Sequence, residues 1–422
     1  MEGLLLFGLL GLFVIIGVPV GIAIGVAAAI AIYISDLPLV IISLKAFAGV
    51  DTFSLLAVPF FILAGSLMST GGIARRIIDF ANTCVGFFTG GLAITTTAAC
   101  MFFAAISGSA IATTSSIGTI MIPEMKKKGY DNSFSSALSA AAGTIGIIIP
   151  PSIPLVIYAI STQTSIGDLF IAGIVPGILF GISLMITCFF ISKKNNYAET
   201  GIRPTVKSVF ISFKKSFLAL MAPVIVLGGI YTGFFTPTEA SVVAVVYSLI
   251  IGTCVYKELD RESIYEAFVS AVVLNGAVCY LISLSMAFSY YLSVNHVPQA
   301  IAGFLLGLTD NSNILFLIIN ILLLIIGCLV DIIPAIIILA PILLPLVEGL
   351  GMTSITFGVI LVANLAIGFV TPPFGLNLFV AAVVGKVTLG EMMKHVKWFI
   401  FAMIISLLVV TFYPPVTMFF VK

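Results

Sequence analysis

Two stretches of this chain interrupt long apolar segments with a pair of prolines: GTIGIIIPPSIP at residues 143–154 and AIGFVTPPFGLN at residues 366–377. Proline lacks an amide hydrogen and its ring clashes with the preceding turn, so paired prolines break a helix. Each break leaves carbonyl groups on one side and amide groups on the other without helical partners. Carbonyl oxygens can bind a cation such as Na⁺, and a helix N-terminus attracts an anion. Both stretches therefore predict broken helices that can bind ions.

The two breaks belong to a gapless repeat in which equivalent positions differ by a fixed offset of 222 in the numbering. In each copy another proline precedes the pair at the same spacing, at 123 before 150 and at 345 before 372. Apolar stretches align Leu with Ile by chance, but they rarely align prolines and glycines. One proline kink would serve packing, whereas matched pairs in a repeat favour a binding site. The matches are Pro123 with Pro345, Gly129 with Gly351, Gly146 with Gly368, Pro150 with Pro372, Pro151 with Pro373, and Ala159 with Ala381.

The composition places these breaks in a membrane protein. Of 422 residues, 61% are hydrophobic and 8% are charged, with a mean hydropathy of +1.28; a soluble domain has roughly 25% charged residues. Apolar runs reach the ~20 residues that cross a hydrocarbon core, and residues 315–327 lack the alternation of a membrane barrel. We expect an all-α polytopic protein.

A net charge of +1 excludes a basic nucleic-acid-binding domain. The six cysteines form no CxxC pair and are predicted to serve packing.

The apolar segments predict spanning helices and two re-entrant hairpins. Residues 107–122 and 331–344 are too short and too interrupted to be ordinary spans. Irregular backbone at this depth is tolerated only where protein or a water-filled cavity covers it, so we predict hairpins whose first arms are residues 92–106 and 314–329. The other predicted spans are residues 3–33, 53–68, 77–88, 133–160, 169–191, 217–235, 238–256, 267–294, 353–384 and 398–420.

The basic residues predict the topology. The connection at residues 193–215 holds six basic residues against one acid, so the positive-inside rule places it in the cytoplasm. Counting crossings from this loop places residues 126–128 inside as well and Glu348 outside. These positions are equivalent in the repeat, so the two copies point in opposite directions. Inverted repeats with broken helices are typical of secondary transporters, whose substrate site lies near the midplane. This count does not assign Arg75-Arg76 cleanly to one side, so the topology of the N-terminal quarter stays open.

Polar groups within the apolar segments are candidates for binding. The first hairpin tip, at residues 107–119, is rich in hydroxyls that can hold helices together or bind Na⁺ or a carboxylate. Glu239 is predicted to have a structural role in a capping box that begins at Thr236. Asp331, at the second tip, can cap the following arm or bind an ion or substrate. We favour binding, because carboxylates inside a membrane are costly and usually functional.

Together these motifs resemble the large membrane subunit of tripartite ATP-independent periplasmic (TRAP) transporters over essentially the full chain. The resemblance implies Na⁺-coupled uptake of a small organic acid across a bacterial inner membrane by an elevator-type motion, with no enzyme activity and no cofactor. It implies two partners, a small membrane subunit and a periplasmic substrate-binding protein, and we expect no fused small subunit. The motifs that carry it are GGIYTGFFTPTEAS (228–241), SGSAIATTSSIGTIMIPEMKKKGY (107–130), GTIGIIIPPSIPLVIYA (143–159) and VTPPFGLNLFV (370–380).

The resemblance also implies a division of the chain and a set of site residues. The expected parts are N-terminal scaffold helices (1–90), a first transport-domain repeat (91–192), a basic cytoplasmic loop with a second scaffold region (193–312), a second, inverted transport-domain repeat (313–394) and a C-terminal helix (395–422). The implied Na⁺ ligands are Ser107, Gly108 and Pro150 in the first repeat and Cys328, Asp331, Thr371 and Pro372 in the second. The implied substrate contacts are Ser109, Thr144, Ser152 and Asn377.

Other functional classes remain open at this point. A one-component Na⁺-coupled dicarboxylate or ion transporter of the same broad fold would need no binding protein. A scaffold or membrane enzyme is a third class, which the lack of clustered catalytic residues disfavours. The sequence does not identify the acid, since C4-dicarboxylates, sialic acids and sugar acids all fit a site of hydroxyls and helix N-termini. It also leaves open Na⁺ against H⁺ coupling and the oligomeric state.

Overall fold

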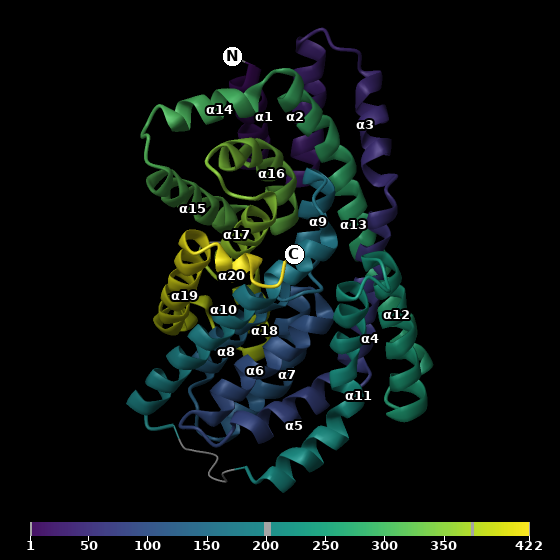
Figure 1. The fold of residues 1–422 in the computed structure, drawn as a ribbon, viewed down its shortest axis with the longest axis vertical. Coiled ribbons are helices and arrows are strands. Elements are labelled where there is room, and N and C mark those ends of the chain that lie inside the picture. The colour runs from purple at the N-terminus through teal and green to yellow at the C-terminus, as the bar shows by residue number, and fades with distance from the viewer. Residues whose placement is uncertain (1, 198–203, 373–374, 422) are drawn as a thin grey trace.

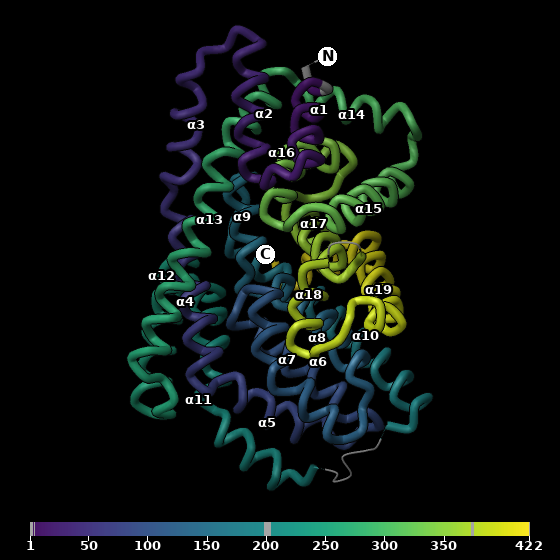
Figure 2. Tube along the Cα trace, turned by 180° about the vertical axis from the view of Figure 1, so that it is seen from behind, coloured from purple at the N-terminus to yellow at the C-terminus, as the bar shows by residue number. Residues whose placement is uncertain are grey.

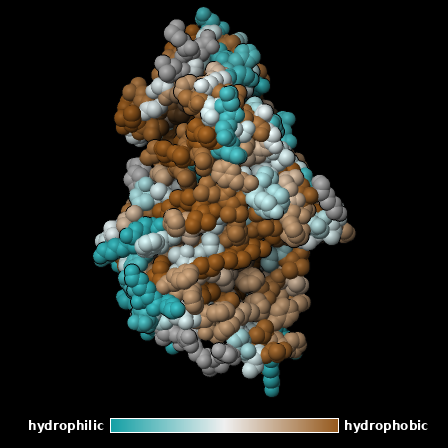
Figure 3. Space-filling model, turned by 60° about the vertical axis from the view of Figure 1, so that its left-hand side comes forward, coloured by the Kyte–Doolittle hydropathy of each residue, from teal (hydrophilic) through white to brown (hydrophobic). Residues whose placement is uncertain are grey.

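The computed structural model describes residues 2–197, 204–372 and 375–421. Every regular element in these ranges is a helix, which confirms the all-α prediction. Eight helical segments among them are long and apolar enough to cross a membrane. Figure 3 shows apolar side chains over most of one face, with hydrophilic side chains gathered toward the upper end, along one edge and at the lower tip.

The helices fall into two groups, with the repeats on one side of the molecule and α3, α4, α12 and α13 along the other (Figures 1 and 2). The 34-residue α13 packs along α2, α3 and α4 and ties this second group together. The elements are α1 (Glu2–Ile15), α2 (Val20–Ile34), α3 (Val40–Val50), η1 (Phe53–Leu56), α4 (Ala57–Thr70), α5 (Ile73–Val85), α6 (Gly91–Ser107), α7 (Ala110–Lys127), α8 (Asn132–Gly143), η2 (Thr144–Ile147), α9 (Ile153–Thr162), α10 (Ile166–Lys194), α11 (Val206–Tyr231), α12 (Pro237–Ile250), η3 (Ile251–Val255), α13 (Arg261–Val294), α14 (Val297–Leu306), α15 (Ser312–Leu329), α16 (Ile332–Gly349), α17 (Ser354–Gly368), α18 (Leu376–Gly385), α19 (Leu389–Phe412) and α20 (Pro415–Met418).

The predicted inverted repeat and its two hairpins are confirmed. Hairpin 1 consists of α6 and α7, and hairpin 2 consists of α15 and α16. The second arms, α7 and α16, begin at Ala110 and Ile332 and end at Lys127 and Gly349, so both pairs of bounds are related by the offset of the sequence repeat. Hairpin 1 enters from the lower part of Figure 1 and hairpin 2 from the upper part, so their tips meet inside the molecule.

The two predicted broken helices are present as well. In the first copy α8 continues into the single turn η2, and α9 begins only after the prolines, at Ile153. In the second copy α17 ends at Gly368 and α18 begins at Leu376. Pro373, the second proline of that pair, lies outside the described residues. Each break therefore ends one helix and starts another in the interior, as the loss of amide donors requires.

The prediction of a single span at residues 3–33 is wrong. The segment forms two antiparallel helices, α1 and α2, which pack against each other. The chain reverses where Gly17 adopts a left-handed φ of 91° and Pro19 precedes the first turn of α2. Because the two helices form a hairpin, the N-terminus and the α2–α3 connection lie at the same end, the upper one in Figure 1.

The predicted span at residues 77–88 is also wrong. Its helix, α5, has 13 residues, carries Arg75 and Arg76, and runs across the lower end of the molecule (Figure 1). The Arg76 guanidinium forms an ion pair with Glu258 at 2.7 Å. This contact places the arginine pair beside the start of α13, on the face to which the other basic segments belong, and so assigns the N-terminal quarter.

Further contacts bring the remaining basic segments to the same end. His395 Nε2 lies 3.2 Å from the Asp131 carboxylate, and the Asp131 N–H donates to Tyr197 Oη at 3.2 Å. Partial burial alone would raise the pKa of Asp131, but hydrogen bonds from Ser133 and His395 outweigh it and hold that pKa below its ordinary value. These residues border the lysines at 126–128, 193–194 and 394–397. By the positive-inside rule, this end faces the cytoplasm.

Candidate functional site

A cavity of about 450 Å³ lies where the two hairpin tips meet the broken helices. Hairpin 1 contributes Ser107, Gly108 and Ser109, and hairpin 2 contributes Asp331. Phe369 lines it from the second break, and α4 and α13 close it from the other group of helices. The cavity thus lies between the repeats and the helices that flank them.

Three helices begin at this cavity. The first residues of α7, α9 and α16, which are Ala110, Ile153 and Ile332, all line it. A helix N-terminus carries a partial positive charge, although at α9 and α16 the first amides, of Ile153 and Ile332, are already hydrogen-bonded within the protein. Of the described lining residues Asp331 alone has an ionisable side chain, and many of the others are serines. The site therefore combines three positive helix ends, neutral hydroxyls and one carboxylate.

The tip of hairpin 1 is fixed directly to the first break. Gly108 adopts a left-handed φ of 61°, and its carbonyl accepts the Ile153 N–H at 3.2 Å. A Cβ at Gly108 would lie 2.8 Å from the Pro151 carbonyl oxygen, so only glycine fits there. Ser109 caps α7 by accepting the Ala112 N–H at 3.3 Å, and Ser107 Oγ lies 2.8 Å from Thr113 Oγ1.

The tip of hairpin 2 has a capping residue at the equivalent position but a different backbone, since Val330 is extended where Gly108 is left-handed. Asp331 is the counterpart of Ser109 in the repeat and caps α16, with Oδ1 accepting the Ile332 N–H at 2.7 Å. Its side chain remains exposed to the cavity. The predicted alternatives for Asp331, cap and binding group, are therefore compatible in one side chain. Glu239, in contrast, completes the predicted capping box with Thr236, accepting the Thr236 N–H at 2.8 Å.

The structure brings four of the candidate residues together at the cavity: Ser107, Gly108, Ser109 and Asp331. Thr144, Ser152 and Asn377 are fully buried behind it and donate to the carbonyls of Ala141 at 2.7 Å, Ile147 at 2.5 Å and Ala140 at 3.1 Å, respectively. Cys328 and Thr371 are absent from the described lining of the cavity: Cys328 donates to the Leu324 carbonyl of its own helix at 3.0 Å, and Thr371, beyond the end of α17, donates to the Ile367 carbonyl at 2.7 Å. Pro150 and Pro372 are likewise absent from the described lining of the cavity.

Sequence reasoning missed the hydroxyls that face the tips from the other side. Ser66, Ser69 and Thr70 of α4 and Ser270 of α13 line the same cavity. Ser69 Oγ is hydrogen-bonded to Ser116 Oγ of hairpin 1. The spacing of three and four residues on α4 puts its hydroxyls on one face of the helix. This spacing is the sequence signal from which the polar face of α4 could have been predicted.

Comparison with known proteins identifies the fold and the family. Residues 7–416 match the family described as "Tripartite ATP-independent periplasmic transporter, DctM component". The chain belongs to the DctM family. The relatives described below are named as transporter permeases and not as enzymes, so this DctM-family chain is a multi-pass permease of the bacterial inner membrane.

Three curated relatives of this DctM-family chain are named for three different substrates. The chain is 40% identical over 377 residues to the C4-dicarboxylate TRAP transporter large permease protein DctM of Pseudomonas aeruginosa, covering 89% of the chain and 88% of that protein. It is 37% identical over 414 residues to the sialic acid TRAP transporter large permease protein SiaM of Vibrio cholerae, covering 98% and 96%. It is 45% identical over 416 residues to the isethionate TRAP transporter permease protein DctMQ of Oleidesulfovibrio alaskensis, covering 98% of the chain but 66% of that longer protein.

Solved structures show the same fold at low sequence identity. The YdaH transporter of Alcanivorax borkumensis matches with a TM-score of 0.62 at 14% identity, covering 87% of this chain and 86% of that one. MtrF of Neisseria gonorrhoeae matches with a TM-score of 0.54 at 14% identity, covering 88% and 84%. The overall fold is thus shared with solved structures that have little sequence similarity to this chain.

Proposed function

We propose that this protein carries a small organic anion into the cytoplasm and uses a Na⁺ gradient to do so. The proposal is carried by the three helix N-termini, at Ala110, Ile153 and Ile332, that meet at one hydroxyl-lined cavity. Helix ends with serine donors bind carboxylate or sulfonate oxygens without a basic side chain. The cavity volume of about 450 Å³ suits a small acid.

Na⁺ is assigned to the junctions between tips and breaks, where hydroxyl and carbonyl oxygens gather. The first set is Ser107, Gly108 and Pro150. In the second, Asp331 is the charged member, and without a cation it would repel an anion in the same cavity. Na⁺ bound near Asp331 removes that repulsion, so the cation and the anion favour each other's binding. The other members of the second set are Cys328, Thr371 and Pro372.

The proposed substrate is a small acid of the kinds named for the relatives. Those names are C4-dicarboxylate, sialic acid and isethionate, the last a small sulfonate and the substrate of the relative that is 45% identical. Sugar acids fit the same chemistry. Ser109, with Thr144, Ser152 and Asn377 behind it, is proposed to contact the acid. The partners proposed are a small membrane subunit and a periplasmic binding protein that delivers the substrate.

Uptake by proteoliposomes tests this function. We expect one of isethionate, succinate or N-acetylneuraminate to accumulate when the chain, the small subunit and the binding protein are present with an inward Na⁺ gradient. Ser107→Ala should reduce uptake about tenfold, the cost of losing a hydrogen bond to a charged group. Ser161→Ala is the matched control, because Ser161 donates to the Ile157 carbonyl of its own helix at 2.8 Å and does not line the cavity.

The same assay separates the alternatives. Equal uptake when choline replaces Na⁺ would contradict Na⁺ coupling. Full uptake by the chain without a binding protein would favour the one-component transporter instead. If none of the acids accumulated under any gradient, the assignment to organic-anion transport would fail.

The proposed motion is that of an elevator, in which the repeats at residues 91–192 and 313–394 move against the scaffold at 1–90 and 193–312. Ser69 of α4 and Ser116 of α7 meet across this boundary and would have to separate in such a motion, which makes the motion testable. In a chain whose native cysteines are replaced, we expect a Ser69→Cys/Ser116→Cys disulfide to abolish uptake and a reductant to restore it. As a control, Thr97→Cys is introduced into a chain that keeps Cys188 as its one native cysteine, because Thr97 Oγ1 lies 3.9 Å from Cys188 Sγ within one repeat. A disulfide between these two positions should leave uptake unchanged, and undiminished uptake by the cross-linked Ser69–Ser116 pair would contradict the motion.

A further inference from the structure

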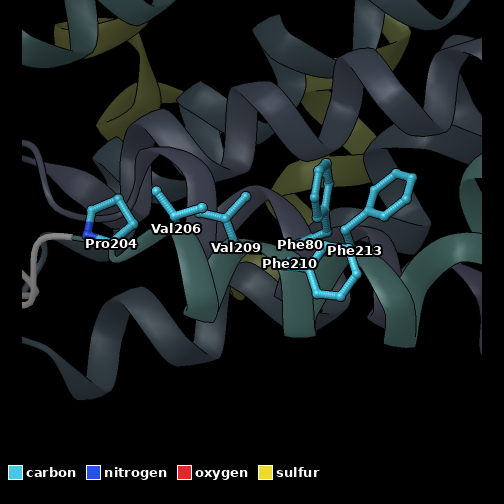
Figure 4. A pocket seen from close by; sticks show the side chains of 6 residues that line it. All are labelled: Phe80, Pro204, Val206, Val209, Phe210 and Phe213. Carbon is cyan, nitrogen blue, oxygen red and sulfur yellow. The ribbon is translucent and has the colours of Figure 1, made fainter.

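A second groove, of about 400 Å³ and lined by apolar residues, lies between α5 and the start of α11 (Figure 4). None of its described lining residues lines the cavity at the hairpin tips. The rings of Phe80 and Phe213 form part of its wall, with centroids 6.1 Å apart. Two other wall residues face outward, since Val206 is 89% exposed and Phe210 is 66% exposed. Pro204 and Val209 complete the described lining. The groove is at the basic end of the molecule, which the positive-inside rule places at the cytoplasmic surface.

Cationic and apolar side chains share the exposed face of α11 beside the groove. Lys207, Phe210, Lys214 and Phe217 follow one another at intervals of three and four residues, so they lie on one face of the helix. All four are exposed. The helix contains no aspartate or glutamate between Val206 and Tyr231, and no described acid lies within ion-pair distance of either lysine.

The opposite flank of the α5–α11 contact is different. There Arg75, Arg76 and Lys215 are accompanied by Asp79 and Glu258, and Arg76 is already paired with Glu258 at 2.7 Å. That flank is largely neutralised by its own acids. The uncompensated positive charge of this region therefore lies on the side of the apolar groove.

We infer that the groove binds an anionic phospholipid of the cytoplasmic leaflet, with an acyl chain against Phe80, Phe210 and Phe213 and the phosphate between Lys207 and Lys214. An amphipathic helix with lysines beside aromatic side chains is the usual arrangement for binding in the headgroup region. Lysine stems lie along apolar surface while their ammonium groups reach the phosphate. Charge complementarity selects an anionic lipid over a zwitterionic one, because α11 offers cations without acids. This inference does not depend on which acid the permease carries.

Native mass spectrometry of the purified full-length chain tests the inference, with dioleoyl-phosphatidylglycerol and dioleoyl-phosphatidylcholine as the added lipids. We expect phosphatidylglycerol to bind more tightly, and Lys207→Gln/Lys214→Gln to weaken its binding at least about fivefold. Phe210→Ser should weaken the binding of both lipids. The matched control is Lys126→Gln/Lys128→Gln, which removes two exposed lysines at the same end but away from the groove.

Each other outcome overturns the inference. Equal loss of binding in both lysine double variants would show diffuse surface attraction without a site. Equal affinity of the wild type for the two lipids would show that the lysines do not select an anion. Loss of bound phosphatidylglycerol when the small subunit is purified with the chain would assign the groove to a protein helix. Because all the substituted side chains are exposed, thermal unfolding of the variants should match the wild type and exclude misfolding as a cause.

Discussion

Replacing Asp331 with asparagine is expected to lower uptake about 10- to 100-fold while leaving the fold intact. Asp331 has two roles in the structure, since it caps α16 through the Ile332 N–H at 2.7 Å and exposes its carboxylate to the cavity. Asparagine is as good an N-cap as aspartate, so Asp331→Asn keeps the cap and removes only the charge. If the carboxylate attracts Na⁺ and thereby admits the anion, transport should be lost even though the helix is still capped.

The measurement is initial uptake rate at several Na⁺ concentrations, paired with thermal unfolding of the same preparation. Asp331→Asn should require much more Na⁺ for half-maximal uptake, with a nearly unchanged melting temperature. Asp331→Ala removes cap and charge together and should also cost about 1 kcal/mol of stability. Asp310→Asn is the matched control at an exposed loop acid. If Asp331→Asn had the Na⁺ dependence of the wild type, Asp331 would serve only as the N-cap of α16 and would not belong to the ion site.

The repeat was predictable because its signals are local and strong. Prolines and glycines determine where a helix breaks or turns, and their positions repeat at a constant offset, so the equivalence of α7 and α16 follows from the sequence without any tertiary information. The predicted segments, 107–122 and 331–344, end five residues before both helices do. The same residues located both hairpin tips, including Ser107–Ser109 and Asp331. Charge counting then supplied the opposite orientation of the two copies.

The two spans at residues 3–33 and 77–88 were predicted wrongly because a short turn or a few charged residues lie within a stretch whose average hydropathy is high. Gly17 and Pro19 turn the chain between α1 and α2, but the surrounding residues are apolar enough to resemble one span. In α5 the charged residues mark a helix that lies across the end of the molecule, and only the contact between Arg76 and Glu258 fixes its side. Ser69 could not be placed from sequence, since its importance comes from its contact with Ser116 on a different helix.

The site residues behind the cavity show a further limit. Motif matching groups Ser109 with Ser152 and Asn377, but only Ser109 lines the space. The other two side chains use their donors on carbonyls of the first broken helix. Exposure within a fold depends on how neighbouring backbones pack, and spacing along the chain does not encode it. Their proposed contact with substrate therefore depends on a rearrangement that the described state does not contain.

Alanine at Gly146 or Gly368 is expected to abolish transport, with a loss of stability of about 1–3 kcal/mol or more. These glycines are equivalent in the repeat and sit where each broken helix crosses a hairpin. A Cβ at Gly146 would lie 2.6 Å from the Ser109 carbonyl oxygen, and one at Gly368 would lie 2.6 Å from Gly327 Cα. Both obstacles are backbone atoms, which cannot turn aside as a flexible side chain can.

Gly118→Ala supplies the control, because a Cβ there would meet its nearest neighbour, Ile122 Cδ1, at an ordinary 3.4 Å. Within the helix α7 that change should be neutral or stabilise by up to about 1 kcal/mol. Thermal unfolding and uptake of the three variants decide the matter. If Gly368→Ala melted and transported like the wild type, the second break would have room to move away from hairpin 2 at no cost. The two copies would then differ in how firmly each break is held against its hairpin, and the ion site at Asp331 would be the looser of the two. If both variants fail together, each break and its tip form one rigid unit, so the Na⁺ ligands proposed from both would be carried as a preassembled group.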